Sequence, residues 1–334
     1  MSLDVVVSPY HLTTREAPAV AALLLASRVV TFLPTPLSGA EKDEFQRAIA
    51  ISPRYLKFMD SLRWTMPLWD RGVIASAHRG QDAGREVRHV CDVLVADDRY
   101  ATLRALTRHD LFEDEKRYLD AVSHDLLRGG PDPGISLPVA GGIDRFGARH
   151  TLAVCRSHAT SIAQRVEDRL ARRLLAIAIP SVLQGDAERI DLIRDELEEP
   201  LDELRAALTN AIAAAYRDVE EPVDRETIAE VEFASRAYTT AFEERRAEFV
   251  ADAKDDPVRL VLGTITLTLA LLPVDAVLRS GLTAMQTLTG PSKRGRTRAA
   301  IEGSVQAPAL AVRDPLAGRS VAALIIKPLG RPHA

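Results

Sequence analysis

The sequence predicts a mainly α-helical protein with a smaller α/β part, and three observations lead to this fold class. Two β-branched runs, residues 3–8 and 28–33, enclose an Ala- and Leu-rich stretch near the N-terminus. Apolar residues then recur at intervals of three and four between residues 151 and 251, which is the spacing of one helix face. Short apolar pieces near the C-terminus have the length of strands or arms.

Composition narrows the class of protein. The chain has 334 residues, 46% hydrophobic and 27% charged, in the range of soluble globular proteins. Its net charge of −4 disfavours a nucleic-acid-coating surface. The two cysteines form no CxxC pair and lack zinc-type spacing, and the N-terminus has no basic segment before a long apolar run. We therefore expect a cytoplasmic protein without disulfides, metal or cofactor.

The N-terminal runs predict a βαβ unit. Residues 3–8 and 28–33 are the expected strands and residues 16–27 the helix between them, so the two strands should be parallel neighbours. No GxGxxG or GxxxxGK[ST] motif follows the first strand, which argues against a phosphate-cradling loop. Polar side chains do follow it, where α/β sheets place ligands, although loop polarity and helix capping explain them more simply. They are Ser8, Tyr10 and His11.

Residues 39–128 complete an α/β-type N-terminal domain over residues 1–128. We expect helices through residues 39–70, a short strand at 72–76, an exposed loop at 78–88 and two further helices up to residue 127. His109-Asp110 and His124-Asp125 carry residue types that hold metals in HD-type phosphohydrolases. The two pairs are only fifteen residues apart on consecutive short helices, so solvated side chains are the better interpretation and no metal site is predicted.

A Gly- and Pro-rich stretch, residues 129–150, is predicted to be a connecting loop. Long glycine-rich loops within compact domains are often functional. The stretch and the helix start after it gather polar groups suited to acid–base work or anion binding. The acid–base candidates are Asp132, Asp144, His150 and His158, and the anion-binding candidates are Arg145, Arg149 and Arg156. The simpler interpretation is that Asp144 caps the helix, the arginines pair with nearby acids and the histidines lie on the surface.

A helical bundle is expected over residues 151–253. Apolar stripes predict helices at residues 151–177, 186–217 and 224–251, with a bend at Pro200. Cys155 lies on the first stripe and should be a buried small apolar residue rather than a nucleophile. The charged opposite faces are read as solvated surface, or as faces that bind a partner helix or another copy.

The last eighty residues contain the least polar segment. Residues 254–290 should form a buried element, and the pattern at 260–288 fits either helix or strand. The charge-free run is too short for a standard membrane span. Residues 291–334 are expected to be a basic linker, centred on 291–298, followed by a C-terminal arm with strand-like pieces at 307–312 and 321–326.

Three functions follow from these expectations. The preferred one is a cytoplasmic interaction or assembly protein without catalytic activity, which uses its amphipathic helices to bind a protein partner or itself. The alternative is a hydrolase acting on a phosphate- or carboxylate-bearing substrate, with its site around residues 129–158. Peripheral membrane contact through residues 260–288 and the basic linker is the third, and no strong case exists for a nucleic-acid partner.

Overall fold

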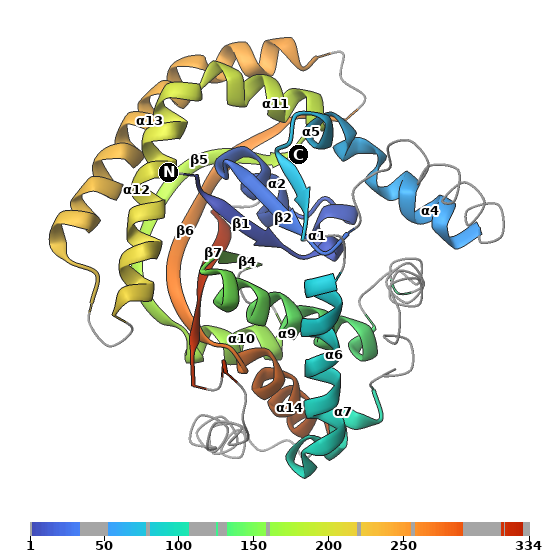
Figure 1. The fold of residues 1–334 in the computed structure, drawn as a ribbon. Coiled ribbons are helices and arrows are strands. Elements are labelled where there is room, and N and C mark those ends of the chain that lie inside the picture. Colours follow the sequence, from blue (N-terminus) through green and yellow to red (C-terminus); the bar gives the residue numbers. More distant parts are fainter. Residues whose placement is uncertain are drawn as a thin grey trace.

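The protein is built around one mixed, seven-stranded β-sheet with helices on both faces (Figure 1). The computed structural model describes residues 2–33, 53–77, 81–106, 125, 132–157, 161–218, 222–254, 258–289, 315–316 and 318–329. The fold is therefore mixed α/β, and the sheet is larger and more central than the smaller α/β part expected from the sequence. Its strands are β1 (Asp4–Val7), β2 (Arg28–Thr31), β3 (Ile74–Ser76), β4 (Ala153–Ser157), β5 (Arg172–Gln184), β6 (Val261–Pro273) and β7 (Ser320–Leu329).

The strand order is β3-β2-β1-β4-β7-β6-β5. Strands β3, β2, β1, β4 and β7 are parallel, whereas β6 and β5 continue the sheet in antiparallel pairing. The parallel neighbours β1 and β2 confirm the N-terminal βαβ unit. Strand β3 and the strand at 321–326 are also confirmed, the latter as part of β7.

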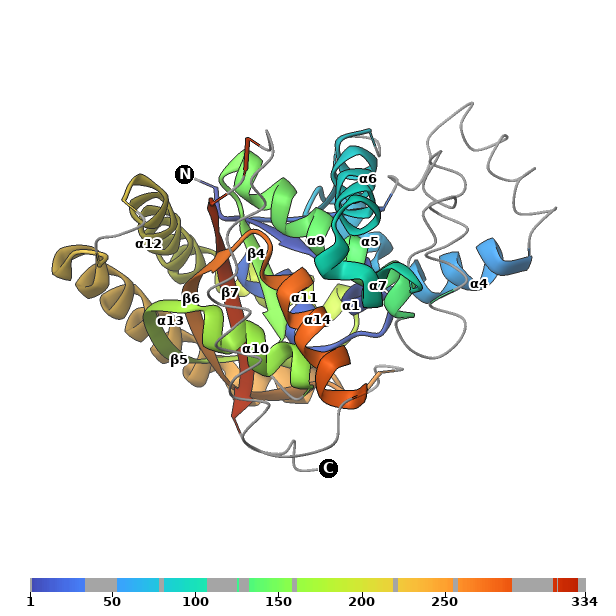
Figure 2. The ribbon, with the colours of Figure 1, turned by 90° about the horizontal axis from the view of Figure 1, so that it is seen from below.

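Adjacent residues of β4 identify the helices on each face, because successive strand side chains point to opposite sides. The thiol of Cys155 contacts the carbonyl oxygen of Pro18 in α2 at 3.6 Å, whereas Arg156 bonds to Asp144 of α9. The α9 side also carries α6, α7, α10 and α14, and the α2 side carries α11, α12 and α13 (Figures 1 and 2).

The helices have the following bounds. They are α1 (Pro9–Thr13), α2 (Ala17–Leu25), α4 (Pro53–Leu62), α5 (Met66–Asp70), α6 (Gln81–Ala96), α7 (Ala101–Arg104), α9 (Pro133–His150), α10 (Ile162–Leu170), α11 (Ala187–Glu196), α12 (Glu198–Arg217), α13 (Arg225–Asp252) and α14 (Ala276–Thr289). The helix expected at 224–251 is confirmed as α13. The one expected at 186–217 is divided at Leu197, and Pro200 lies in the first turn of α12, where a missing N–H costs nothing.

The loop predicted at 129–150 is wrong over its described part, because α9 occupies residues 133–150. Asp132 caps the helix by accepting from the Gly134 N–H at 2.9 Å, and Thr151 ends it in the left-handed conformation. Two of the glycines are packing residues: a Cβ at Gly142 would lie 2.7 Å from a Val87 methyl carbon of α6, and one at Gly147 would lie 2.8 Å from a Val154 methyl carbon of β4. Tertiary contact, rather than chain reversal, accounts for these small residues.

The single helix predicted at 151–177 is also wrong. That segment forms β4, α10 and the start of β5. The burial pattern of β5 shows why: the expected helical stripe ended with Leu174 and Ile177, whereas the structure buries Leu175, Ile177 and Ile179, whose i, i+2 spacing places them on one face of a strand. The exposed loop expected at 78–88 is corrected as well, since α6 begins at Gln81.

The choice left open at 260–288 is settled, because strand β6 and helix α14 divide the segment between them. Within the described residues, no helix has both the length and the apolarity to cross a membrane. Cys91 and Cys155 are buried free thiols, and burial raises the pKa of the Cys155 thiol to about 12. The apolar burial expected for Cys155 is confirmed, although on a strand. The pieces at 291–298 and 307–312 lie outside the described residues.

Candidate functional site

The topology of the sheet marks one place where a ligand would bind. After β1 the chain passes to α2 on one face, and after the adjacent parallel strand β4 it passes to α10 on the other face. This divergence is a topological switch point, and open α/β sheets bind ligands in the crevice beyond the carboxyl ends of such strands. We call the side chains that meet there, His11, Glu16, Asp144, Arg156 and Glu167, the switch-point cluster.

His11 and Glu16 form a pair at the carboxyl end of β1. The Nε2 atom of His11 lies 3.5 Å from one carboxylate oxygen of Glu16, and the other oxygen accepts a 3.3 Å hydrogen bond from the hydroxyl of Thr14. The side chain of His11 is mostly buried, while that of Glu16 is 43% exposed. Burial lowers the pKa of His11; Glu16 opposes this shift and the positive charge of Arg156 adds to it. The imidazole is therefore held neutral at physiological pH.

A strained turn places Glu16 beside His11. Arg15 adopts a left-handed conformation, with φ of 53°, between α1 and α2. This lets the Glu16 N–H donate to the His11 carbonyl at 3.1 Å, so that the glutamate turns back toward the histidine. The Arg15 guanidinium lies 4.9 Å from the centre of the Trp64 ring, whose N–H donates to the Leu12 carbonyl at 3.1 Å. Backbone strain of this kind in a non-glycine residue costs about 1–3 kcal/mol and is concentrated at functional sites.

Arg156 connects the other members of the cluster. It bonds to Asp144 of α9, and its Nε atom lies 4.0 Å from a carboxylate oxygen of Glu167 in α10. One guanidinium thus faces the fully buried carboxyl group of Asp144 and the half-buried one of Glu167. Burial raises the pKa of Asp144 to about 7, against the opposing effect of Arg156, and burial also raises the pKa of Glu167. The cluster therefore combines a neutral base with a carboxyl group that holds its proton close to neutral pH.

Three buried polar atoms of the cluster have no hydrogen-bond partner. They are Nδ1 of His11, the second carboxylate oxygen of Asp144 and Nε of Arg156. Buried polar atoms are bonded in the large majority of cases, and exceptions are characteristic of catalytic sites or of places where water or an ion binds. Three such atoms on elements that meet at one switch point favour a ligand site over a purely structural ion pair.

The candidates from the sequence separate into different places. Asp144 and Arg156 belong to the cluster, whereas Asp132 is the cap of α9. Arg145 and Arg149 both pair with Glu86 of α6, at 3.0 and 2.6 Å, and so join two helices. His150 is exposed at the end of α9, its ring 4.5 Å from that of Phe146.

His158 lies outside the described residues, as do both members of the His109-Asp110 pair and His124 of the second pair. Within the part of the chain that the structure describes, no three His, Cys, Asp or Glu side chains are arranged to hold a metal ion.

Sequence reasoning missed Glu16 and Glu167. Glu16 is the first acidic residue after His11, five positions further along the chain. Only the left-handed conformation of Arg15 brings the two side chains into contact. Glu167 carried no signal, because its segment was assigned to the wrong helix. Comparisons of the chain with protein families, with curated proteins and with solved structures give no match.

Proposed function

We propose that the protein is a hydrolase that acts on an anionic substrate at the switch-point cluster. The observation that carries this proposal is the His11–Glu16 pair, which leaves Nδ1 of the imidazole unbonded and within the electrostatic influence of Arg156. A neutral histidine oriented by a carboxylate on one nitrogen is the usual arrangement of a general base. This proposal keeps the substrate class expected from residues 129–158 but moves the base to the carboxyl end of β1.

In the proposed reaction, Nε2–H of His11 donates to Glu16 and Nδ1 takes a proton from an attacking water. The resulting hydroxide attacks an acyl or phosphoryl group, and the protonated His11 returns the proton to the leaving group, so that no cofactor is consumed. Arg156 attracts the anionic group of the substrate. Nδ1 is buried, so the side chains around it must move aside when substrate enters, as catalytic contacts often form fully only in the complex.

The test is an assay of the full chain with p-nitrophenyl phosphate and p-nitrophenyl acetate. We expect His11→Gln to lower kcat/KM about 100-fold or more, the usual contribution of a general base. The matched control is His150→Gln, which removes an exposed histidine of α9 and should leave kcat/KM unchanged. Equal effects of the two substitutions, or the absence of turnover by the wild-type chain, would argue against the proposal.

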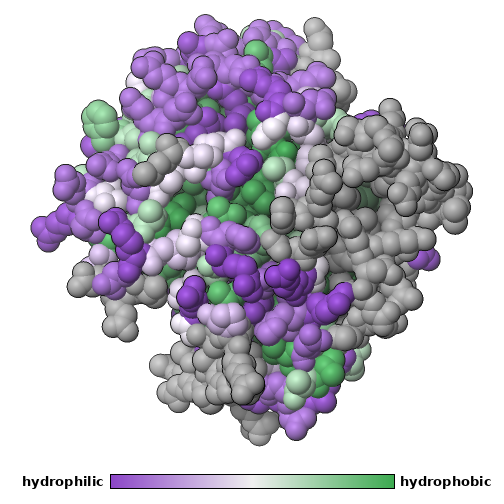
Figure 3. Space-filling view, in the orientation of Figure 1, coloured by the Kyte–Doolittle hydropathy of each residue, from purple (hydrophilic) through white to green (hydrophobic). Residues whose placement is uncertain are grey.

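A second candidate is the association role expected from the amphipathic helices. The apolar stripe of α13, including Tyr238, Phe242 and Phe249, is buried within the chain, and Figure 3 shows mainly hydrophilic side chains over α13 and α11. Association is nevertheless supported by Phe233 and Val250, which are 67% and 50% exposed on α13. Light scattering at several concentrations tests it: a dimer that becomes monomeric in Phe233→Ser would support self-association, and a strict monomer would argue against it.

A further inference from the structure

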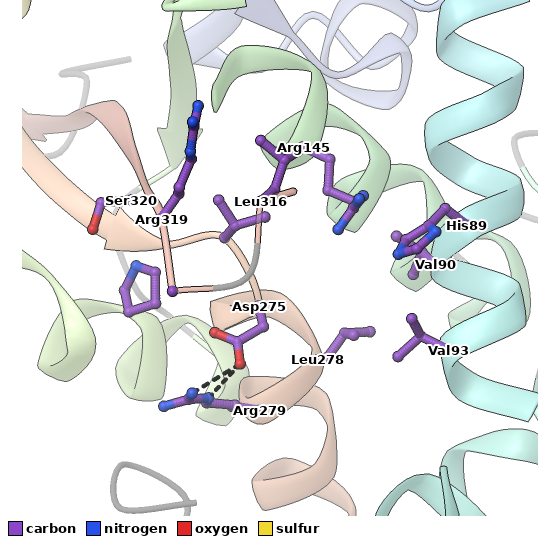
Figure 4. Close-up of a pocket in the computed structure, with 13 residues that line it drawn as sticks. His89, Val90, Val93, Arg145, Asp275, Leu278, Arg279, Leu316, Arg319 and Ser320 are labelled. Atoms are coloured by element: carbon purple, nitrogen blue, oxygen red, sulfur yellow. Dashed lines mark hydrogen bonds and ion pairs between the residues drawn. The ribbon is translucent and has the colours of Figure 1, made fainter. Parts of the chain in front are cut away.

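A pocket of about 240 Å³ lies at the opposite edge of the sheet from the switch-point cluster. It is formed where β6 ends at Pro273 and β7 begins at Ser320, and α6, α9 and α14 complete its walls (Figure 4). Because β7 is parallel to β4, this is the amino edge of the parallel strands, whereas the cluster lies at their carboxyl ends. Helix α9 runs between the two places, since Arg145 of the pocket directly follows Asp144 of the cluster, and each place carries its own proposal.

The charged groups of the pocket are predominantly cationic. Arg145, Arg279 and Arg319 line it together with His89, and Asp275 is the acid among the lining residues. Asp275 pairs with Arg279 at 2.8 Å. Glu86, just behind the wall, is shared between Arg145 and Arg149. Arg149, which lies outside the lining, balances the charge of Glu86, so the three lining arginines and Asp275 leave an excess of two positive charges among the described residues.

The arginines differ in how they are held. Arg145 is buried and fixed by Glu86, so its guanidinium keeps one orientation, directed toward His89 in Figure 4. Arg279 is held by Asp275, with both side chains mostly buried. Arg319 is exposed at the rim and points away from Asp275, and its guanidinium has no ion pair within the part of the chain that the structure describes. A fixed floor with one unpaired cation at the rim is suited to capturing an anion that enters from solvent.

The remaining walls are apolar. Val90 and Val93 of α6 face Leu278 of α14 and Leu316 across the pocket. The volume is below the roughly 300–1,000 Å³ of pockets for drug-sized ligands, so the occupant must be small. Guanidinium groups bind phosphate and carboxylate oxygens in a bidentate manner, and an excess of two positive charges matches the dianion of a phosphomonoester better than a carboxylate monoanion.

We propose that this pocket binds a small phosphomonoester, with the phosphate held by Arg145, Arg279 and Arg319 and a compact apolar group against Val93 and Leu278. Asp275 competes with the phosphate for Arg279, so binding requires the arginine to be shared between the two. The pocket does not depend on the hydrolase activity proposed for the switch-point cluster.

Isothermal titration of the full chain with phenyl phosphate, inorganic phosphate and benzoate tests the proposal. Phenyl phosphate should bind most tightly, because it satisfies both the cationic and the apolar walls, and its affinity should fall as salt is added. Arg279→Gln should weaken the binding of phenyl phosphate at least tenfold. Asp275→Asn should strengthen it severalfold, because it removes the competing charge while the main-chain carbonyl of residue 275 still accepts from the N–H groups of Leu278 and Arg279.

Two substitutions serve as controls. Arg71→Gln removes an exposed arginine that pairs with Asp191 and Asp195 elsewhere on the surface, and it should leave the affinity unchanged. His11→Gln is the second control: phenyl phosphate is not turned over at the switch-point cluster of this variant, and the heat that remains should still respond to Arg279→Gln and Asp275→Asn. No heat of binding, or binding that does not respond to either Arg279→Gln or Asp275→Asn, would overturn the proposal. Tighter binding of benzoate than of phenyl phosphate would overturn the assignment to phosphomonoesters.

Discussion

Two groups of buried arginines in this protein differ in what their N–H groups bond to. Arg194 of α11 and Arg205 of α12 donate to main-chain carbonyl oxygens at the end of α2, at distances of 2.6–3.4 Å. Arg205 also pairs with the exposed carboxylate of Asp202 in its own helix, whereas Arg145 and Arg279 pair with the mostly buried carboxylates Glu86 and Asp275. The last carbonyls of a helix have no partner within the helix and carry partial negative charge, so the first group completes the C-terminus of α2.

The difference indicates which arginines are available for function. A carbonyl oxygen in the last turn of α2 cannot leave, and no ligand can replace the arginine that satisfies it. Burial lowers the pKa of Arg194 to about 10, and the positive charge of Arg205 adds to this shift. A carboxylate partner can share its arginine with an incoming anion. We therefore infer that the α2 arginines are structural and the pocket arginines are recognition residues.

The largest expected effect is at Arg205. Arg205→Met should lower the free energy of unfolding by about 2–5 kcal/mol, because it leaves the carbonyl of Leu25 without its arginine donor and removes one of the two arginine donors of the Leu24 carbonyl. Urea unfolding measures the change. The matched control is Arg173→Gln, since Arg173 is 59% exposed and pairs with Asp168 at the surface; there we expect a change within about 0.5 kcal/mol. Equal changes at both sites would contradict the distinction between the two groups of arginines.

The next effect concerns the Asp144–Arg156 pair and its dependence on pH. The pKa of Asp144 is about 7 in the folded protein, against an ordinary value of 3.8 that applies to the unfolded chain. At a pH between these two values, the folded state therefore keeps a proton that the unfolded state releases. The contribution of Asp144 to stability is therefore greatest near pH 4 and falls toward pH 7, by at most about 4 kcal/mol, whereas His11, whose pKa burial lowers, contributes with the opposite sign below pH 6.5. Arg156, Glu167 and Asp275 all act on this carboxyl group.

Asp144→Asn should flatten this fall, measured as the free energy of unfolding at pH 4, 5.5 and 7. Glu167, whose pKa burial also raises, contributes a fall of the same sign that should persist in the variant. A pH profile of Asp144→Asn that matches the profile of the wild type would show that Arg156 keeps Asp144 ionised, and the switch-point cluster would then be an ordinary buried ion pair.

Local patterns predicted part of the fold. The β-branched runs at β1 and β2 and the long stripe of α13 were sufficient, because each element is determined by its own periodicity. The segment 151–177 failed because alternating and helical spacings coincide over a few apolar residues, and only pairing with β6 decides in favour of β5. The antiparallel extension of the sheet by β6 was therefore not predictable from one chain segment alone.

The candidate site was predicted less well, for a related reason. Asp144 and Arg156 were chosen because they lie close together in the sequence, and the structure does bring them into contact. His11 was noted for its place after a strand, but its partner Glu16 depends on a single left-handed residue. The pocket joins α6, α9 and α14, which are distant in the sequence, so nothing in the local pattern associates Arg145 with Arg279.

The smallest effect tests the glycine that brings α6 and α9 together. Gly142→Ala places a methyl group 2.7 Å from a side-chain carbon of Val87 and 3.1 Å from its main-chain nitrogen, so the helices must separate. We expect a loss of about 1–3 kcal/mol in the free energy of unfolding, the usual cost of overpacking. Because Glu86 holds Arg145 across the same contact, phenyl phosphate binding should weaken as well.

Gly84→Ala is the matched control in α6. Outside the adjoining backbone no atom lies within 4 Å of the added Cβ, so the better helix propensity of alanine should stabilise the protein by up to about 1 kcal/mol. Equal stability of the two variants would show that α6 and α9 adapt freely to the methyl group. That result would contradict the rigid placement of Arg145 in the pocket.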